Sequence, residues 1–271
     1  MVSALANLPK ISIVIPSFNQ GDFIEATLLS LLDQKYPNLE LIVIDGKSTD
    51  DTVEVIKKYS DRIIYWVSEK DQGQTDALIK GFQVATGEIW GWLNSDDLHE
   101  PLTLWEVAEF FSAHPNAQVV FGDCSWITME GRPIRPMREI PFIRFIWLFS
   151  HNYIPQPSTF WRAALYRQAG GLDRTFNLAM DTDLWSRFSE ETRIWHVNSY
   201  WSRFRTYPEQ KNRALREQSD AEDHRIRARM LPKNMNVKLA RAILFPFAKA
   251  IRILLKFIGG KYFWGSKKPE F

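Results

Sequence analysis

The sequence is poor in cysteine and lacks long uncharged apolar runs. Cys124 is the only cysteine among 271 residues, which excludes an intramolecular disulfide and a zinc site built from several thiolates. This usage is typical of a reducing compartment. Because the N-terminus shows no basic start followed by an apolar run, we expect a cytoplasmic protein. No apolar stretch reaches the ~18 residues of a transmembrane helix, so none is expected.

The glycine-rich motifs of common nucleotide-binding folds are also missing. The chain contains no G-x-G-x-x-G turn and no P-loop, which disfavours a dehydrogenase and a P-loop NTPase. A nucleotidyltransferase would carry a Gly-rich loop with a basic residue after the first strand. That place holds Pro16-Ser17-Phe18-Asn19-Gln20, so this class ranks low.

Acidic residues are scarce near the C-terminus. From Lys233 onward there are nine Lys or Arg residues and one acid, Glu270, a net charge of +8. Since the whole chain carries +2, the remainder carries −6. An acidic body with a basic end does not resemble a nucleic-acid-binding domain, and no nucleic-acid partner is expected.

In the first hundred residues, strand and helix signals alternate. Continuous β-branched or apolar runs predict strands buried on both faces at Ile11–Ile15, Leu41–Ile44, Ile63–Val67 and Ile89–Leu93. Helical spacing between them predicts crossover helices, the first with a capping box of Asp22 and Glu25 and the third closed by Gly87. This order predicts an α/β fold with a mostly parallel sheet flanked by helices.

Polar or turn-forming residues follow each of these strands. Ligands bind beyond the C-terminal strand ends of such sheets, so we expect these residues to share one cleft. Asn94-Ser95-Asp96-Asp97 ends the fourth strand, and adjacent carboxylates suit a hard divalent cation that holds a diphosphate. A solvated turn that caps the next helix is the alternative. Asp45 and Asp71-Gln72-Gly73 suit a ribose, a base or a phosphate, or are ordinary turn residues.

These elements in this order resemble the family-2 inverting glycosyltransferases of the GT-A fold. The resemblance covers about residues 10–206 and is carried by ISIVIPSFNQGDFIEATLLSLLDQ, LELIVIDGKSTDDT, EKDQGQTDALIKGFQVATGEIWGWLNSDD, QPSTFW, GGLD and MDTDLWSRF. It implies that the chain transfers a sugar from a nucleotide-sugar donor to an acceptor hydroxyl. The acceptor would be a glycan or a lipid-linked sugar in cell-surface polysaccharide or glycolipid assembly.

The resemblance also implies roles for donor-side residues. Pro16 and Asn19 would lie along the nucleoside, Asp45 would recognise the base, and Asp71 would lie near the ribose beside Gly73. The 94–97 segment matches an Asp-x-Asp-type motif, in which Asp96 would touch the donor and Asp97 would be the main ligand of Mn²⁺ or Mg²⁺. The chain departs from the family at two positions, with Asn94 in place of the first Asp and Tyr207 where a metal-binding His is expected. His151 and His196 are the available substitutes, although a lone His is more often structural.

In the second half, the resemblance places the catalytic base at Asp181, whose alternative role is a helix N-cap. Asp183 is a weaker candidate on the acceptor side, because residues two apart on a helix point about 200° away from each other. Gln156 and Trp161 would shape the acceptor side, with core packing an equal alternative.

Residues 237–258 carry apolar side chains and Lys or Arg at helical spacing. A stripe is expected from Leu239, Ile243, Phe247, Ile251, Leu254 and Ile258, with Pro246 kinking or splitting the helix. We therefore predict a transferase domain over 1–232 and a basic amphipathic tail over 233–271 that contacts a membrane peripherally or packs on the domain. A non-catalytic sugar- or partner-binding module is the remaining alternative function.

Overall fold

The computed structural model describes residues 8–208, 210–233 and 235–261. The four predicted N-terminal strands are present as β1 (Ile11–Ser17), β2 (Leu39–Asp45), β3 (Tyr65–Ser68) and β4 (Ile89–Trp92). They pair in parallel in the order β3-β2-β1-β4. The sheet continues with β5 (Leu98–His99), β6 (Val119–Ile127), β7 (Pro133–Met137), β8 (Thr159–Arg162) and β9 (Ile194–Arg205).

The second half of the sheet mixes directions. Strand β8 runs antiparallel to both β4 and β6, whereas β6 and β9 pair in parallel. The full order is β3-β2-β1-β4-β8-β6-β9-β5, with β7 on β6. Because β1, β2 and β4 are parallel neighbours, their C-terminal ends meet at one edge, where the predicted site residues lie.

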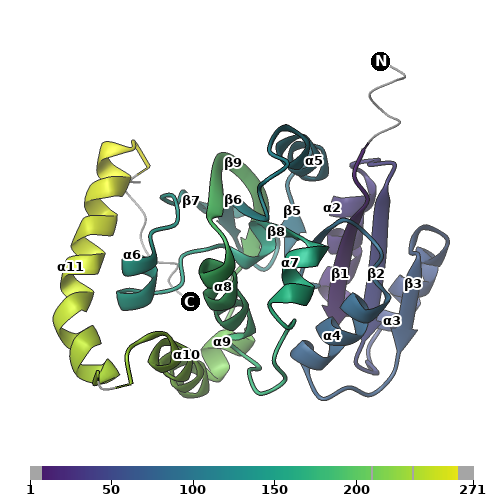
Figure 1. Ribbon diagram of the computed structural model, residues 1–271. Helices are drawn as coiled ribbons and strands as arrows, with labels where there is room; N and C mark the ends of the chain where they lie inside the picture. The colour runs from purple at the N-terminus through teal and green to yellow at the C-terminus, as the bar shows by residue number, and fades with distance from the viewer. Residues whose placement is uncertain (1–7, 209, 234, 262–271) are drawn as a thin grey trace.

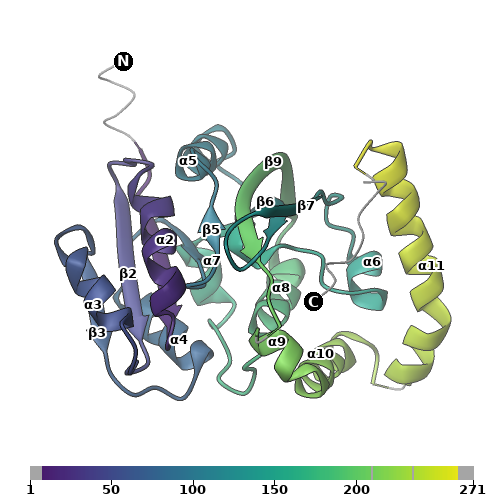
Figure 2. The ribbon, with the colours of Figure 1, turned by 180° about the vertical axis from the view of Figure 1, so that it is seen from behind.

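Helices cover both faces of the sheet (Figures 1 and 2). One face packs against α2 (Gly21–Leu32), α3 (Thr52–Lys58) and α5 (Thr103–Ala113). On the other side lie α4 (Gln74–Val84), α6 (Arg144–Phe149), α7 (Ala163–Gln168) and α8 (Met180–Glu191), with α10 (Arg216–Met230) packed on α8 and α11 (Val237–Ile258) packed on α6 and α10. Short turns complete the described elements: η1 (Ser60–Arg62), η2 (Gln156–Ser158) and α9 (Lys211–Ala214).

Two predicted helix caps are wrong. Helix α2 begins at Gly21, so Asp22 is already inside the helix, and Glu25 accepts hydrogen bonds from Lys58 and Tyr59 instead. Helix α4 ends with an extended Ala85 as its cap. Gly87 serves a close approach between chain segments, because a Cβ there would lie 2.4 Å from the Ser12 hydroxyl oxygen.

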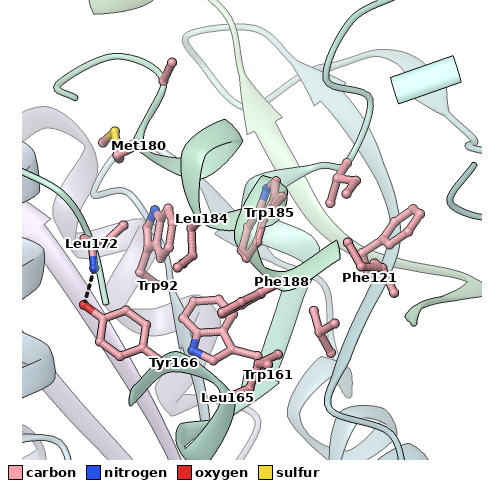
Figure 3. Close-up of a cluster of buried hydrophobic side chains, with 14 of the residues drawn as sticks. Trp92, Phe121, Trp161, Leu165, Tyr166, Leu172, Met180, Leu184, Trp185 and Phe188 are labelled. Carbon is pink, nitrogen blue, oxygen red and sulfur yellow. Dashed lines mark hydrogen bonds between the residues drawn. The ribbon is translucent and has the colours of Figure 1, made fainter. Parts of the chain in front are cut away.

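The high tryptophan content is explained mainly by the core. Among the described residues six tryptophans are buried, and Trp92, Trp161 and Trp185 form one aromatic cluster between the sheet and α8 (Figure 3). The ring centroids of Trp161 lie 5.5 Å from those of both Trp92 and Trp185. Such rings contribute large buried areas and geometric specificity, so this cluster fixes α8 relative to β4 and β8.

Helix α11 forms the end of the molecule opposite β3 (Figures 1 and 2). It is one helix with Pro246 inside it, so the proline does not split it. It packs on α6 and α10 through Ala248 and its neighbours. None of the helices in the described residues combines the length and apolarity needed to cross a bilayer.

Candidate functional site: two adjoining cavities

A cavity of about 590 Å³ opens where β1, β2 and β4 end. Its wall contains the predicted residues Pro16, Asp71, Gly73 and Asp96, which come from three separate segments. The other lining residues are Ser17, Phe18, Gln20, Gly46, Lys70, Gln74, Ala77, Asn94, Ser95, Phe204, Tyr207, Gln210 and Lys211. We call it the first cavity.

Two glycines shape this wall. Gly73 has φ 107° and ψ 177°, a conformation that side chains other than glycine's rarely adopt, and it immediately precedes α4. A Cβ on Gly46 would lie 2.8 Å from Asp71 Oδ2, so a larger residue there would require the Asp71 side chain to move. The amino end of α4 thus opens onto the first cavity, where backbone N–H groups and the helix dipole favour an anion.

Asp71 lies in this wall, as predicted. Its Oδ1 accepts a hydrogen bond from the Gly73 N–H at 2.8 Å. Burial raises the pKa of the Asp71 carboxyl above its ordinary value. The carboxylate therefore holds the turn before α4 while remaining part of the cavity wall.

Asp45 and Asn19 are not among the residues that line the first cavity. The Asp45 carboxylate is fully buried and accepts hydrogen bonds from the Ser48 N–H at 2.9 Å and the Ser68 hydroxyl at 2.6 Å. Asn19 Oδ1 accepts from the Thr49 N–H. The Asp45 oxygens hold the loop after β2, and the expected contact of Asp45 with a base stays a prediction.

The adjacent acids Asp96 and Asp97 point to different surroundings. Asp96 lines the first cavity, and one of its oxygens accepts a hydrogen bond from the Tyr207 hydroxyl at 2.8 Å. Asp97 is 0% exposed, and it accepts from the Arg205 backbone N–H at 2.9 Å and from the Asn94 amide at 3.3 Å. Asp97 therefore fastens the end of β9 and Asp96 faces the cavity, while the role of Asp97 as the main metal ligand stays a prediction.

Burial of both carboxyls and the repulsion between them make negative charge on Asp96 and Asp97 unfavourable. Burial raises the pKa of Asp96, and burial together with the charge of Asp96 raises the pKa of Asp97 well above its ordinary value. Within residues 8–208, 210–233 and 235–261, no three His, Cys, Asp or Glu side chains come together as a metal cluster. A hard cation that uses one carboxylate and substrate phosphates needs no such cluster, so Asp96 suits this mode.

A second cavity of about 560 Å³ adjoins the first. Gln74, Asn94 and Phe204 line both, so these side chains form the boundary between them. Asp181, at the start of α8, lies in the wall of the second cavity. The base candidate is therefore separated from the first cavity only by this boundary.

Asp181 has the protonation behaviour of a general base. Its Oδ2 accepts a hydrogen bond from the Asn152 amide at 3.0 Å. Burial raises its pKa to about 6, with bonds to Thr182 opposing the shift. A carboxylate with this pKa is ionised at neutral pH and is a stronger proton acceptor than an ordinary Asp.

Comparison with known proteins assigns the family. The glycosyl transferase family 2 profile matches residues 12–170, more than half of the chain. The chain belongs to glycosyl transferase family 2.

A family-2 relative, the PGL/p-HBAD biosynthesis glycosyltransferase of Mycobacterium bovis, is 32% identical over 198 residues, which cover 70% of this chain and 75% of the relative. An uncharacterized glycosyltransferase of Mycobacterium tuberculosis is 29% identical over 183 residues, 66% of this chain and 68% of the relative. Both confirm the glycosyltransferase assignment.

Solved structures confirm the GT-A-type α/β fold. S. aureus TarS in complex with UDP superimposes with a TM-score of 0.63 at 22% identity, over 81% of this chain and 64% of that one. The mannosyltransferase PcManGT of Pyrobaculum calidifontis, in complex with GDP-Man and Mn²⁺, gives a TM-score of 0.65 at 18% identity, over 95% of this chain and 78% of that one.

Two acceptor-side predictions for this family-2 chain are wrong. Trp161 is 0% exposed within the aromatic cluster and has no surface for a ligand. Asp183 is also fully buried and pairs with Arg187 and Arg229, so it fastens α8 to α10. Gln156, in contrast, lines the second cavity together with Asp181.

The predicted histidine substitutes do not reach the acid pair. His196 bonds to Asp123 at 2.9 Å, and His151 lies in the second cavity beside Ser150. Tyr207 holds the position next to Asp96 instead. This family-2 chain therefore keeps a neutral hydroxyl where the family pattern has a metal-binding His.

Sequence reasoning missed several lining residues. Phe18, 58% exposed, presents an aromatic side chain to the first cavity, and Lys70 and Lys211 bring cations to the same wall. Arg252 and Lys256 of α11 line the second cavity. Only Phe18 had a local signal, as an aromatic residue beside a strand end. Glu139, the partner of Arg252 and Lys256, lies more than a hundred residues away from them in sequence.

Proposed function

We propose that this family-2 chain is an inverting transferase that moves a sugar from a nucleoside diphosphate donor to an acceptor hydroxyl. The observation that carries the proposal is the pair of adjoining cavities, with Asp181 in the second and the amino end of α4 on the first. The donor occupies the first cavity and the acceptor the second. The sugar lies at the boundary formed by Gln74, Asn94 and Phe204.

The chemistry is a single displacement at the anomeric carbon. The acceptor oxygen forms a bond to that carbon as Asp181 takes its proton. The bond from the carbon to the diphosphate oxygen breaks, and the leaving nucleoside diphosphate keeps the electron pair. A base on one side and a leaving group on the other give inversion, and this arrangement requires no second catalytic carboxylate.

Positive groups in the first cavity, away from Asp181, offset the negative charge of the diphosphate. The α4 amino end and Lys70 favour an anion there. Asp96 would hold Mn²⁺ or Mg²⁺ together with the phosphates, which relieves the repulsion within the acid pair. When bound, the cation stabilises negative charge on the leaving group.

The outer face of α11 supports a peripheral membrane contact. The expected apolar stripe is on the exposed side of the helix, with Leu239 at 60%, Phe247 at 61% and Ile258 at 72% exposure. Lys238 and Lys249 are exposed on the same helix. An apolar stripe beside cations suits an anionic lipid surface, and a lipid-linked acceptor in cell-surface glycan assembly fits this placement.

Thermal unfolding with UDP, GDP, TDP and CDP, each with and without Mn²⁺, tests the donor assignment. A ligand at 100 times its dissociation constant adds about 2.7 kcal/mol to the stability of the folded state. We expect one nucleotide to give a metal-dependent shift that Asp96→Asn abolishes. Asp61→Asn, at an exposed position outside both cavities, is the control.

Either of two results would contradict the proposal. No shift with any nucleotide would favour a non-catalytic binding module. A shift that Asp96→Asn leaves intact would remove the metal from the mechanism while leaving the donor site in place.

A further inference from the structure

The second cavity has a wall that the catalytic proposal does not use. Arg252 and Lys256, one turn apart on the inner face of α11, line it together with Glu139. Arg252 Nη2 lies 2.7 Å and Lys256 Nζ 2.8 Å from the same oxygen, Glu139 Oε1. Two cations therefore share one carboxylate.

This wall carries a surplus of positive charge. The cationic lining residues are Arg135, Arg252 and Lys256, and the acidic ones are Glu139 and Asp181. The side chains of Arg252 and Lys256 are each 13% exposed, and the buried Arg252 Nε has no hydrogen-bond partner. A buried donor without a partner is costly. The exposed part of the Arg252 and Lys256 side chains leaves both cations within reach of an anion that enters the cavity.

The other face of the same helix is apolar and exposed. Leu254, 56% exposed, lies between Arg252 and Lys256 in sequence and belongs to the outer stripe. One helix therefore presents cations to the acceptor cavity and apolar side chains to the surroundings. A lipid that carries an anionic group next to its sugar matches both the cationic wall of the cavity and the apolar outer face of the helix.

We infer that the acceptor is a lipid-linked sugar whose phosphate group binds to Arg252 and Lys256 in the second cavity. The inference rests on the proposed function, because it assigns the acceptor of that same site. The phosphate lies against the wall formed by α11, and the acceptor hydroxyl lies at Asp181. Glu139 keeps the two cations in place in the absence of acceptor.

Calorimetric titration of the full chain with farnesyl phosphate, farnesol and inorganic phosphate tests the inference. We expect farnesyl phosphate to bind at least about tenfold more tightly than either of the others, since a charge-assisted hydrogen bond is lost in one and the apolar chain in the other. Equal binding of farnesol and farnesyl phosphate would overturn the phosphate assignment. Equal binding of inorganic phosphate would overturn the lipid assignment.

Variants test whether Arg252 contacts the acceptor or only forms a structural ion pair with Glu139. Arg252→Gln should remove about tenfold of the affinity for farnesyl phosphate, Arg252→Lys should restore part of it, and the exposed Lys249→Gln should change nothing. Glu139→Gln should tighten phosphate binding, because it frees two cations. A structural bridge predicts no tightening, and weaker or unchanged binding in Glu139→Gln would overturn the inference if that variant folds.

The same proteins distinguish the two proposals. If the nucleotide-dependent thermal shift is present but the phosphate preference is absent, only the acceptor assignment fails. If the nucleotide shift is absent, the donor assignment fails whatever the outcome with farnesyl phosphate. Should Glu139→Gln not fold, the comparison of Arg252→Gln with Arg252→Lys decides.

Discussion

At the scale of single residues, Asp181 and Asp183 lie two positions apart on α8, and we expect the first to act in catalysis and the second to stabilise the fold. Asp181 lines the second cavity and accepts a bond from Asn152. Asp183 points to the opposite side and is enclosed by Arg187 and Arg229. The helical angle between them makes each a control for the other.

Asp181→Asn should lower kcat by about 10²–10⁴-fold, the usual contribution of a general base, and leave nucleotide binding unchanged. Asp183→Asn should instead cost about 2–3 kcal/mol of folding free energy, less than a fully buried pair because Arg229 is half exposed. Steady-state kinetics and urea unfolding of both variants measure the two effects. A large loss of kcat in a folded Asp183→Asn protein would contradict the assignment.

The pKa of Asp181 sets an expected pH profile. Since the base acts when ionised, kcat should fall as pH decreases through about 6. The sign for stability is opposite, because a carboxyl whose pKa is raised by folding stabilises the folded state below its unfolded pKa and loses that contribution as pH rises through about 6. Asp181→Asn should therefore melt higher than the wild type at pH 7 and similarly at pH 4. A pH-independent difference in melting temperature would contradict this.

Residue roles that depend on distant partners could not be predicted from the sequence. Asp96 and Asp97 are equivalent in a local pattern, and only the Arg205 N–H, 108 positions away, decides which of them is buried. Trp161 was assigned to the acceptor side because motif position does not report burial. By contrast, Asp71, Gly73 and Pro16 were expected in one cleft and do line the first cavity, because they lie at or near the C-terminal ends of parallel strands, which must meet at one edge.

At the scale of elements, the turn before α4 depends on one glycine. Gly73→Ala should cost about 1–3 kcal/mol, because its backbone conformation suits glycine, and it should also weaken nucleotide binding. Gly170→Ala is a matched control, with φ 83° and open space around the site outside both cavities. It should lose stability without loss of nucleotide affinity. Urea unfolding and nucleotide titration of both variants give the comparison.

Helix α11 is expected to bind membranes through its outer stripe. Phe247→Glu should reduce co-sedimentation with phosphatidylglycerol vesicles by about tenfold or more, because it removes an exposed aromatic ring that would enter the bilayer and adds charge repulsion. Ile64→Glu is the control, since Ile64 is 67% exposed but lies on a different element. Equal loss in both variants, or no loss in Phe247→Glu, would remove the membrane role of α11.

At the scale of the whole molecule, the division into 1–232 and 233–271 stays a prediction that truncation can test. The residues that line the first cavity all precede position 212, so a 1–232 chain should keep its nucleotide-dependent thermal shift. Its melting temperature should fall, because α6 and α10 lose the helix that covers them. Loss of the nucleotide shift in a folded 1–232 chain would show that the tail is part of the donor site.

Under the proposed function, the thickness of α11 has a consequence for the length of the acceptor that the enzyme can use. A helix with its side chains measures about 10–12 Å across, and α11 separates the second cavity from whatever lies against its outer face. With that face on the bilayer, sugar addition takes place roughly one helix diameter above the lipid. This distance would limit the length of the acceptor, because a hydroxyl close to the lipid anchor could reach the site and the far end of a long glycan could not. If the proposed acceptor and membrane contact hold, the enzyme would suit the early additions of an assembly sequence, before the product becomes longer than this spacing.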